Sequence, residues 1–269
     1  MWNVKCGVCH PERSNVVAES IYETSQLVDL VELGSKEQDP DLIFPFFILG
    51  VMNNKQFVVN PFGVNGFVLS NDAGDAILID PSVSNEQEEA ALANYIATNN
   101  LTVRHLLNTH LHLDHVLGNA FVARKYGVQP EAHEEDAFLL DLQEEQSQMF
   151  GLPLREHSPG LGNYLAEGDA VEVPGIKLQV FHIAGHSPGG IAFFCENPGE
   201  VNGQKDVPPL LFPGDIMFAG SRGRSDLFGG DDDALVSGIK TKLLTLPKET
   251  VVFPGHGPMT TIADERRWY

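Results

Sequence analysis

Cysteine is scarce in this chain, which has only Cys6, Cys9 and Cys195 among its 269 residues. A set this small and odd does not build a disulfide framework, which indicates a reducing compartment. Cys6, Cys9 and His10 have the spacing of covalent c-type haem attachment, but that chemistry needs export. The first residues lack the basic and apolar regions of a secretory signal. We therefore interpret the cysteine pair as incidental and expect a cytoplasmic protein.

Long apolar runs and basic residues are scarce as well. The candidate for a membrane span, "LIFPFFILGVM", is too short and contains a proline. The 17 lysines and arginines stand against 37 aspartates and glutamates, which gives a formal net charge of −20. A field of that sign repels phosphate backbones and anionic lipid surfaces. We therefore expect neither a nucleic acid nor a membrane as a partner.

The composition changes after about residue 45. Residues 1–45 are polar and acidic with only a weak helical pattern, and we expect an extension that is disordered or not part of the fold. Residues 46–269 are expected to form one folded domain. With 42% hydrophobic residues over the whole chain, the length suits a single large α/β domain with an ample core.

Strand-like runs alternate with single helices from residue 56 onward. The runs "QFVV", "GFVLS" and "AILID" are separated by turn residues and predict an antiparallel meander. Ser84 and Gln87 predict a capping box that opens a helix over 85–99. Further strands are predicted within 101–108, 169–185, 189–196, 208–215 and 250–257, and further helices over 116–127, 133–149 and 232–246. This alternation favours α/β layers.

A cluster of ligand-type residues follows the strand predicted within 101–108. His110, His112, Asp114 and His115 form the pattern His-x-His-x-Asp-His. In extended backbone, residues i and i+2 point to the same side, so His110 and His112 can bind one ion. His115 follows the turn and suits a second ion. Imidazole and carboxylate are ligands that a divalent ion such as zinc accepts.

Three more ligand-type residues each follow a predicted strand and an adjacent glycine, namely His186, Asp215 and His256. Burial of such groups at the edge of an apolar sheet is costly unless a partner such as a metal ion pairs them. The remaining histidines outside the extension lack this context and are interpreted as ordinary strand, helix or loop residues. They are His105, His133, His157 and His182.

These motifs resemble those of the metallo-β-lactamase superfamily and, within it, the glyoxalase II-like hydrolases. The resembling stretches are "NPFGVNGFVLS…AILIDPS", "THLHLDH", "GHSPGG", "FPGDIMFAGSRGRSDL" and "VFPGHGPMTTIADERR". They run from about residue 50 to the end of the chain. The resemblance implies that 46–269 form a catalytic domain of the α/β class with the four-layer αββα sandwich of this superfamily.

The resemblance also implies two divalent metal ions. One ion would be held by His110, His112 and His186, and the other by Asp114, His115 and His256. Asp215 would bridge the two. Zinc is the expected metal, with iron and manganese as alternatives.

A second resembling segment, Gly-Arg-Ser/Thr-Asp in the family, lies near the metal site. Arg224 and Asp226 match it, which makes Arg224 a candidate for substrate binding. Arg222 stands where the family usually has an apolar residue, and we interpret it as an exposed, solvated side chain.

The implied activity is hydrolysis of an acyl thioester of the hydroxyacylglutathione type by a metal-bridging hydroxide. Asp114 would orient the nucleophile or take its proton, and Asp215 would bridge the ions. Glyoxalase II has a C-terminal helical domain that grips glutathione, whereas only 13 residues follow His256 here. A different thioester, or a lactone, is therefore an alternative substrate.

Three rival activities exist within the same superfamily. A persulfide dioxygenase would use one iron on His110, His186 and Asp215, but "FPGHGP" resembles the dinuclear hydrolases. A β-lactamase is disfavoured by the lack of an export signal and by the carboxylate of Asp215. A nuclease is disfavoured by the negative charge.

Overall fold

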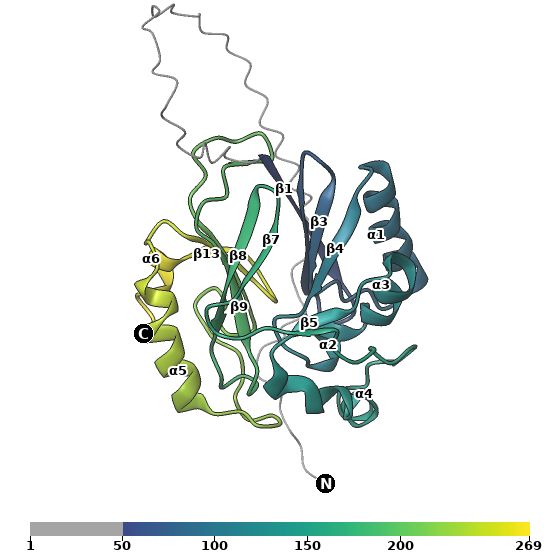
Figure 1. Cartoon of the computed structure of the whole chain (residues 1–269). Coiled ribbons are helices and arrows are strands. Elements are labelled where there is room, and N and C mark those ends of the chain that lie inside the picture. The colour runs from purple at the N-terminus through teal and green to yellow at the C-terminus, as the bar shows by residue number, and fades with distance from the viewer. Residues whose placement is uncertain (1–50) are drawn as a thin grey trace, which may run out of the picture. The chain divides into compact units, whose positions relative to one another are not determined.

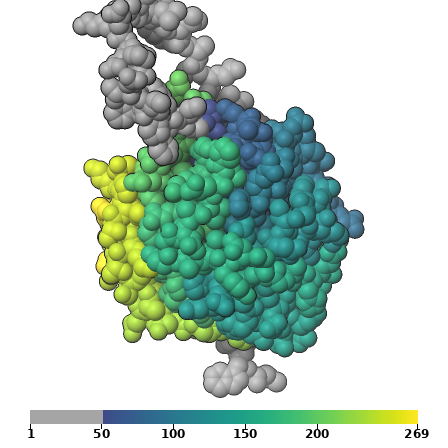
Figure 2. Space-filling view, viewed as in Figure 1, coloured from purple at the N-terminus to yellow at the C-terminus, as the bar shows by residue number. Residues whose placement is uncertain are grey.

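The computed structural model describes residues 51–269, which form two stacked β-sheets with helices on their outer faces (Figure 1). The extension predicted over 1–45, with its cysteine pair, lies outside the described residues. The blue N-terminal part and the yellow C-terminal part of this domain lie on opposite sides of it (Figure 2).

The first sheet has seven strands in the order β10-β1-β2-β3-β4-β5-β6. They are β1 (Val51–Val59), β2 (Val64–Asn71), β3 (Asp75–Ile79), β4 (Thr102–Leu107), β5 (Pro130–Ala132), β6 (Asn163–Tyr164) and β10 (Glu200–Val201). Strands β1 to β3 pair antiparallel, which confirms the predicted meander. Strands β3 to β6 pair parallel, so β3, β4 and β5 end at the same edge.

The second sheet has six strands in the order β13-β12-β11-β9-β8-β7. They are β7 (Ala170–Val173), β8 (Ile176–His182), β9 (Ile191–Cys195), β11 (Leu210–Gly214), β12 (Val251–Pro254) and β13 (Thr260–Thr261). Strand β13 was not expected from the sequence. Only β11 and β12 pair parallel, and the other neighbours are antiparallel.

Helices cover both outer faces. On the first sheet these are α1 (Glu86–Thr98) and α3 (Asn119–Tyr126), and on the second α5 (Asp232–Thr241). Shorter helices are α2 (Leu113–Val116), η1 (Glu134–Leu140), α4 (Gln143–Phe150), η2 (Leu243–Thr245) and α6 (Ile262–Glu265). None of the helices in this part of the chain is long and apolar enough to cross a membrane.

The core follows from the two-residue period of the strands. Ile77 and Ile79 of β3 pack into the cluster between the sheets, together with the buried rings of Phe67, Phe193 and Phe212. Their neighbours on β3, such as Leu78, point to the opposite face and pack against the helices. The predicted αββα architecture is therefore confirmed.

The predicted helix over 133–149 is interrupted. A 3-10 helix ends at Leu140, and α4 starts at Gln143 after Leu142, whose φ and ψ are −100° and 14°. The break has a physical reason, because Asp136, Gln143 and Gln146 are buried and accept hydrogen bonds from backbone N–H groups of other segments rather than from solvent.

The start of α1 also differs by one residue from the prediction. The cap is Asn85, whose side-chain oxygen accepts hydrogen bonds from the backbone N–H groups of Gln87 and Glu88. Ser84 instead donates its hydroxyl and its backbone N–H to the carboxylate of Glu88. Asn85 offers its side-chain oxygen directly to the free N–H groups of the first turn and is therefore the N-cap, whereas Ser84 precedes the helix and binds Glu88.

Candidate metal centre

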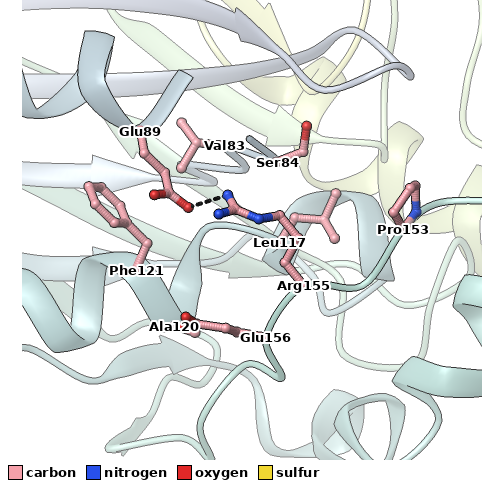
Figure 3. Close-up of a pocket in the computed structure, with 9 residues that line it drawn as sticks. All are labelled: Val83, Ser84, Glu89, Leu117, Ala120, Phe121, Pro153, Arg155 and Glu156. Carbon is pink, nitrogen blue, oxygen red and sulfur yellow. Dashed lines mark hydrogen bonds and ion pairs between the residues drawn. The ribbon is translucent and has the colours of Figure 1, made fainter. Parts of the chain in front are cut away.

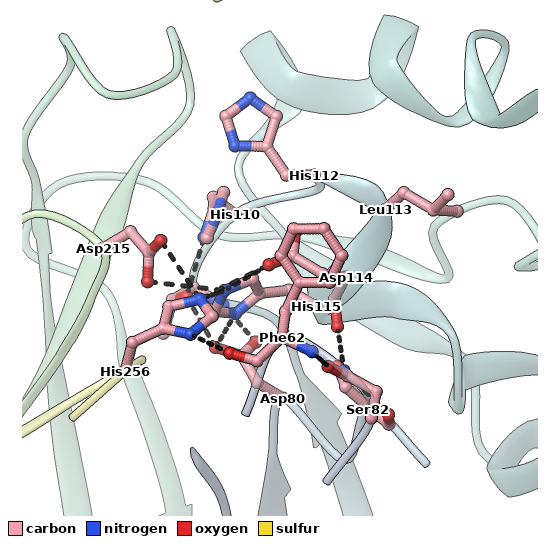
Figure 4. Close-up of polar contacts among 12 residues, drawn as sticks. Phe62, Asp80, Ser82, His110, His112, Leu113, Asp114, His115, Asp215 and His256 are labelled. Carbon is pink, nitrogen blue, oxygen red and sulfur yellow. Dashed lines mark hydrogen bonds and ion pairs between the residues drawn. The ribbon is translucent and has the colours of Figure 1, made fainter. Parts of the chain in front are cut away.

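All seven predicted ligands lie at one end of the two sheets. The His-x-His-x-Asp-His segment follows β4 of the first sheet, and α2 starts at Leu113, within this segment. The other three follow strands of the second sheet, with His186 after β8, Asp215 after β11 and His256 after β12. Figure 4 shows Asp215 and His256 of the second sheet turned toward His110, Asp114 and His115, which follow the first.

The first group consists of His110, His112 and His186, all of which are buried. Nε2 of His186 lies 3.2 Å from Nε2 of His110 and 3.0 Å from Nδ1 of His112. A tetrahedral zinc ion with Zn–N distances near 2.0–2.1 Å separates its nitrogen ligands by about 3.3 Å. Three imidazole nitrogens at this spacing therefore fit one divalent ion.

The second group consists of Asp114, His115 and His256. Nε2 of His256 lies 3.3 Å from Nε2 of His115 and 3.3 Å from Oδ2 of Asp114. Nε2 of His115 lies 3.8 Å from the same carboxylate oxygen. Two nitrogens and one oxygen in this arrangement suit a second divalent ion.

The carboxylate of Asp215 lies between the two groups. Its Oδ2 is 3.7 Å from Nε2 of His186 and 3.4 Å from Nε2 of His256. Its Oδ1 is buried, has no hydrogen-bond partner, and lies 3.4 Å from Nε2 of His115. Such a buried acceptor is costly unless a cation pairs it. The donor set and this unpartnered atom therefore both fit a pair of metal ions.

Hydrogen bonds fix the orientation of the ligand rings. Nδ1 of His186 donates to the backbone carbonyl of Arg224 at 2.7 Å, and Nδ1 of His256 donates to that of Phe62 at 3.1 Å. Carbonyl oxygens only accept, so Nδ1 carries the proton in both rings and Nε2 offers its lone pair to an ion.

Asp80, directly after β3, contacts the candidate site and was not singled out from the sequence. Its Oδ2 lies 3.0 Å from Nδ1 of His115 and accepts the hydroxyl of Thr109 at 2.6 Å. Its Oδ1 accepts the N–H of Thr109 at 2.9 Å. These contacts hold Asp80 at a φ of +45°, which is unusual for a residue other than glycine. Asp80 therefore orients His115 as a carboxylate behind the ligand.

Asn65 on β2 is a second residue that the sequence analysis missed. Its side-chain amide is buried and donates at 2.9 Å to the carbonyls of Pro254 and Gly257, and its N–H donates to that of Gly255 at 2.8 Å. These three bonds hold the segment that carries His256 against the first sheet.

The two groups differ in their electrostatics. Burial and the neighbouring imidazoles lower the pKa of His110 well below its usual value, and the same causes lower that of His112 to about 3. Burial alone would also lower the pKa values of His115 and His256. The carboxylates of Asp215 and Asp114 overcome this and raise both, that of His115 strongly.

The other four histidines lie outside the two groups, as interpreted from the sequence. His105 contacts Glu131 and His157 contacts the exposed Glu144. The rings of His133 and His182 stack with centroids 3.8 Å apart, and Glu135 lies close to both. Nε2 of His182 donates to the carbonyl of Pro188, so it is already engaged.

The predicted arginines are paired with carboxylates. Arg224 forms two hydrogen bonds with Asp226. Arg222, the residue that departs from the family pattern, forms two with Asp232. The guanidinium of Arg224 is exposed, and its role in substrate binding stays a prediction.

A separate pocket lies between α1, α3 and residues 153–156 (Figure 3). Arg155 projects into it and forms an ion pair with Glu89 at 2.8 Å. None of the seven ligand-type residues lines it. The chemistry of the protein is therefore expected at the metal centre rather than in this pocket.

Comparison with known proteins agrees with this geometry. A family model described as the metallo-beta-lactamase superfamily matches residues 59–256, which include all seven ligand-type residues. The chain belongs to the metallo-beta-lactamase superfamily. Its relatives and its His and Asp groups identify it more closely as a metallo-hydrolase of that superfamily, a fold that implies divalent metal ions.

Three similar proteins are informative. The hydroxyacylglutathione hydrolase GloC of Haemophilus influenzae is 34% identical over 217 residues, covering 80% of this chain and 96% of that protein. A protein solved in a di-iron-bound form is 34% identical, with a TM-score of 0.65 and coverages of 79% and 97%. The BLEG-1 B3 metallo-beta-lactamase is 30% identical, with a TM-score of 0.69 and coverages of 80% and 96%.

The pKa directions predict that acid removes the two ions in sequence. An ion at Asp114, His115 and His256 must displace protons from imidazoles whose pKa values are raised, so its affinity falls early as the pH decreases. His110 and His112 resist protonation to lower pH. Metal content after equilibrium dialysis at stepped pH should fall from two ions to one and then to none. Loss of both in one step would contradict this order.

Substitution Asp80→Asn should weaken binding of one ion selectively. The amide has no negative charge and only one oxygen for the donors of His115 and Thr109, and loss of such a supporting carboxylate costs about 10- to 100-fold in metal affinity. We expect this loss for the ion at Asp114, His115 and His256, measured by competition with a chelator. Asp75→Asn, on the same strand but facing Arg104 at the surface, is the matched control and should bind like wild type.

Proposed function

We propose that the protein is a dinuclear metal-dependent hydrolase of acyl thioesters, similar in activity to glyoxalase II. The observation that carries this proposal is the carboxylate of Asp215, which lies within 3.7 Å of ligand nitrogens from both groups. The similarity to GloC supports a thioester as the substrate, since that relative is named a hydroxyacylglutathione hydrolase. Zinc is the metal proposed, and the di-iron form of a similar protein makes iron the alternative.

The chemistry would divide between the ions and the side chains. Two divalent cations held here would supply hydroxide from water at neutral pH and polarise the carbonyl of the acyl group. Asp215 would set the separation of the two groups. Asp114, near the Nε2 atom of His256, would orient the attacking water or take its proton. A thiol leaving group with a pKa near 8.5 departs as the thiolate, so no further proton donor is needed.

The surroundings of the site favour apolar contact with the substrate. The ring of Phe62 is about half exposed, lies beside Asp114 and His256 in Figure 4, and packs edge-on against Phe150 with centroids 6.4 Å apart. The nearby arginines are neutralised by aspartates. We propose that Phe62 contacts the acyl or thiol portion of the substrate.

Hydrolysis of a β-lactam is a second candidate. The similarity to the BLEG-1 lactamase, at 30% identity over four fifths of the chain, favours it. Both reactions need hydroxide and a polarised carbonyl, so the same metal centre suits either. The sequence argument against it remains the carboxylate of Asp215. The two candidates therefore differ in the substrate that the surrounding loops accept.

Metal analysis followed by a substrate panel tests the proposal. Protein purified without added metal or chelator should contain about two ions per chain, mainly zinc or a zinc–iron mixture. It should hydrolyse lactoylglutathione or a neutral acyl thioester faster than a lactone or a β-lactam. One iron per chain together with persulfide oxidation would overturn the proposal, and so would a preference for the β-lactam.

Substitution Asp215→Asn tests the bridging role. An amide has no negative charge to share between two cations, so we expect hydrolysis to fall more than about 100-fold, beyond the range for residues that only support a ligand. The circular dichroism spectrum should stay unchanged, because Asp215 lies at the end of β11 rather than in the core. Asp141→Asn, an exposed aspartate, is the control. Retained activity in Asp215→Asn would refute the bridging role.

A further inference from the structure

Asp136 carries a fully buried carboxylate that none of the assigned roles explains. It lies in η1, which follows β5 of the first sheet, and its side chain and backbone have no exposed surface. No ion pair neutralises it among the described residues of the chain. Its burial is costly unless hydrogen bonds satisfy its two oxygens.

Three donors satisfy this carboxylate, and all three belong to segments that carry metal ligands. Oδ2 accepts the backbone N–H of Leu111 at 3.1 Å and the hydroxyl of Ser187 at 2.8 Å. Oδ1 accepts the backbone N–H of Gly189 at 2.5 Å. Leu111 lies between His110 and His112, and Ser187 follows His186. One carboxylate therefore contacts both segments that supply the first group of imidazoles.

These two segments come from different sheets. Leu111 follows β4 of the first sheet, whereas Ser187 and Gly189 lie between β8 and β9 of the second. A Cβ atom at Gly189 would lie 2.7 Å from the backbone nitrogen of Asp136 and 2.8 Å from its carboxyl carbon. Only glycine allows this approach, so the turn after His186 is shaped around Asp136.

We infer that Asp136 is a positioning residue, which joins the two ligand segments across the sheets and sets the spacing of His110, His112 and His186 for their ion. Its hydrogen bonds go to backbone N–H groups and a hydroxyl rather than to an imidazole. Asp80 acts differently, because it contacts the ring of His115 directly. The two buried carboxylates thus serve different ions. This inference rests on the metal centre of the proposed function.

The test measures metal affinity for each ion separately. In a His256→Ala background, the ion at His110, His112 and His186 is measured. In a His112→Ala background, the ion at Asp114, His115 and His256 is measured. Adding Asp136→Asn should lower zinc affinity about 10- to 100-fold in the first background and leave it unchanged in the second. Affinity is measured by chelator competition, and melting temperature is recorded without metal for every variant.

Two further variants keep the experiment decisive. Ser187→Ala removes one of the three donors and should give a smaller loss in the same background, even if Asp136→Asn folds poorly. Asp141→Asn should change neither affinity. A merely structural role would lower the metal-free melting temperature and weaken both ions equally. That result, or an unchanged affinity in the His256→Ala background, would overturn the inference.

Failure of the proposed function gives a different result. If wild-type protein binds zinc but hydrolyses no thioester, the proposed activity is wrong, and the predicted selectivity of Asp136→Asn still applies. If wild-type protein binds no metal ion at the first group, both the proposed function and this inference are wrong.

Discussion

The metal centre depends on the packing of one sheet against the other. Four ligand-type residues follow β4 of the first sheet, and three follow strands of the second. Each of the two groups contains residues from both sheets, so neither sheet alone can complete either group. The spacing between the sheets is set by the aromatic core, in which Phe67 and Phe212 pack with ring centroids 5.1 Å apart. Ligand atoms need placement within a few tenths of an ångström, which hydrophobic packing alone does not supply. Directional hydrogen bonds supply the remaining precision in the placement of the ligand atoms.

These bonds form three polar connections, of which two cross between the sheets and the third lies within the first sheet. Asn65 holds the segment of His256 to β2, Asp136 joins the segments of His110 and His186, and Asp80 aligns His115. Each of the three side chains is buried, and each forms hydrogen bonds with a segment that carries a ligand-type residue. In a low-dielectric interior such bonds are strong when complete and costly when broken. The strained φ of Asp80 persists because its contacts with Thr109, Asn108 and His115 determine it.

Local patterns in the sequence predict which ligand-type residues come together, but they do not predict the residues that support them. His110 to His115 form one contiguous motif, and His186, Asp215 and His256 each follow a strand and a glycine, so their contexts agree. The contact of Asp80 with His115 spans 35 positions, and that of Asn65 with Pro254 spans 189, so no local pattern indicates either. The helix predicted over 133–149 fails for the same reason. Its amphipathic period is present, but Asp136 and Gln146 form hydrogen bonds with residues more than twenty positions away, and these bonds interrupt the helix.

Specificity must arise outside the ligand set. GloC and the BLEG-1 lactamase resemble this chain to a similar degree, at 34% and 30% identity, yet their names imply different substrates. Both substrates present a carbonyl carbon to the same kind of centre, so the metal ligands do not distinguish them. The residues that can do so lie on the loops at the ends of the sheets. Phe62 contributes to the site in two ways, because its carbonyl accepts a hydrogen bond from His256 and its ring lies beside Asp114 and His256, where we propose that it contacts the substrate. A change in that ring can alter substrate choice while the backbone still holds the ligand, which separates selection of the substrate from binding of the metal.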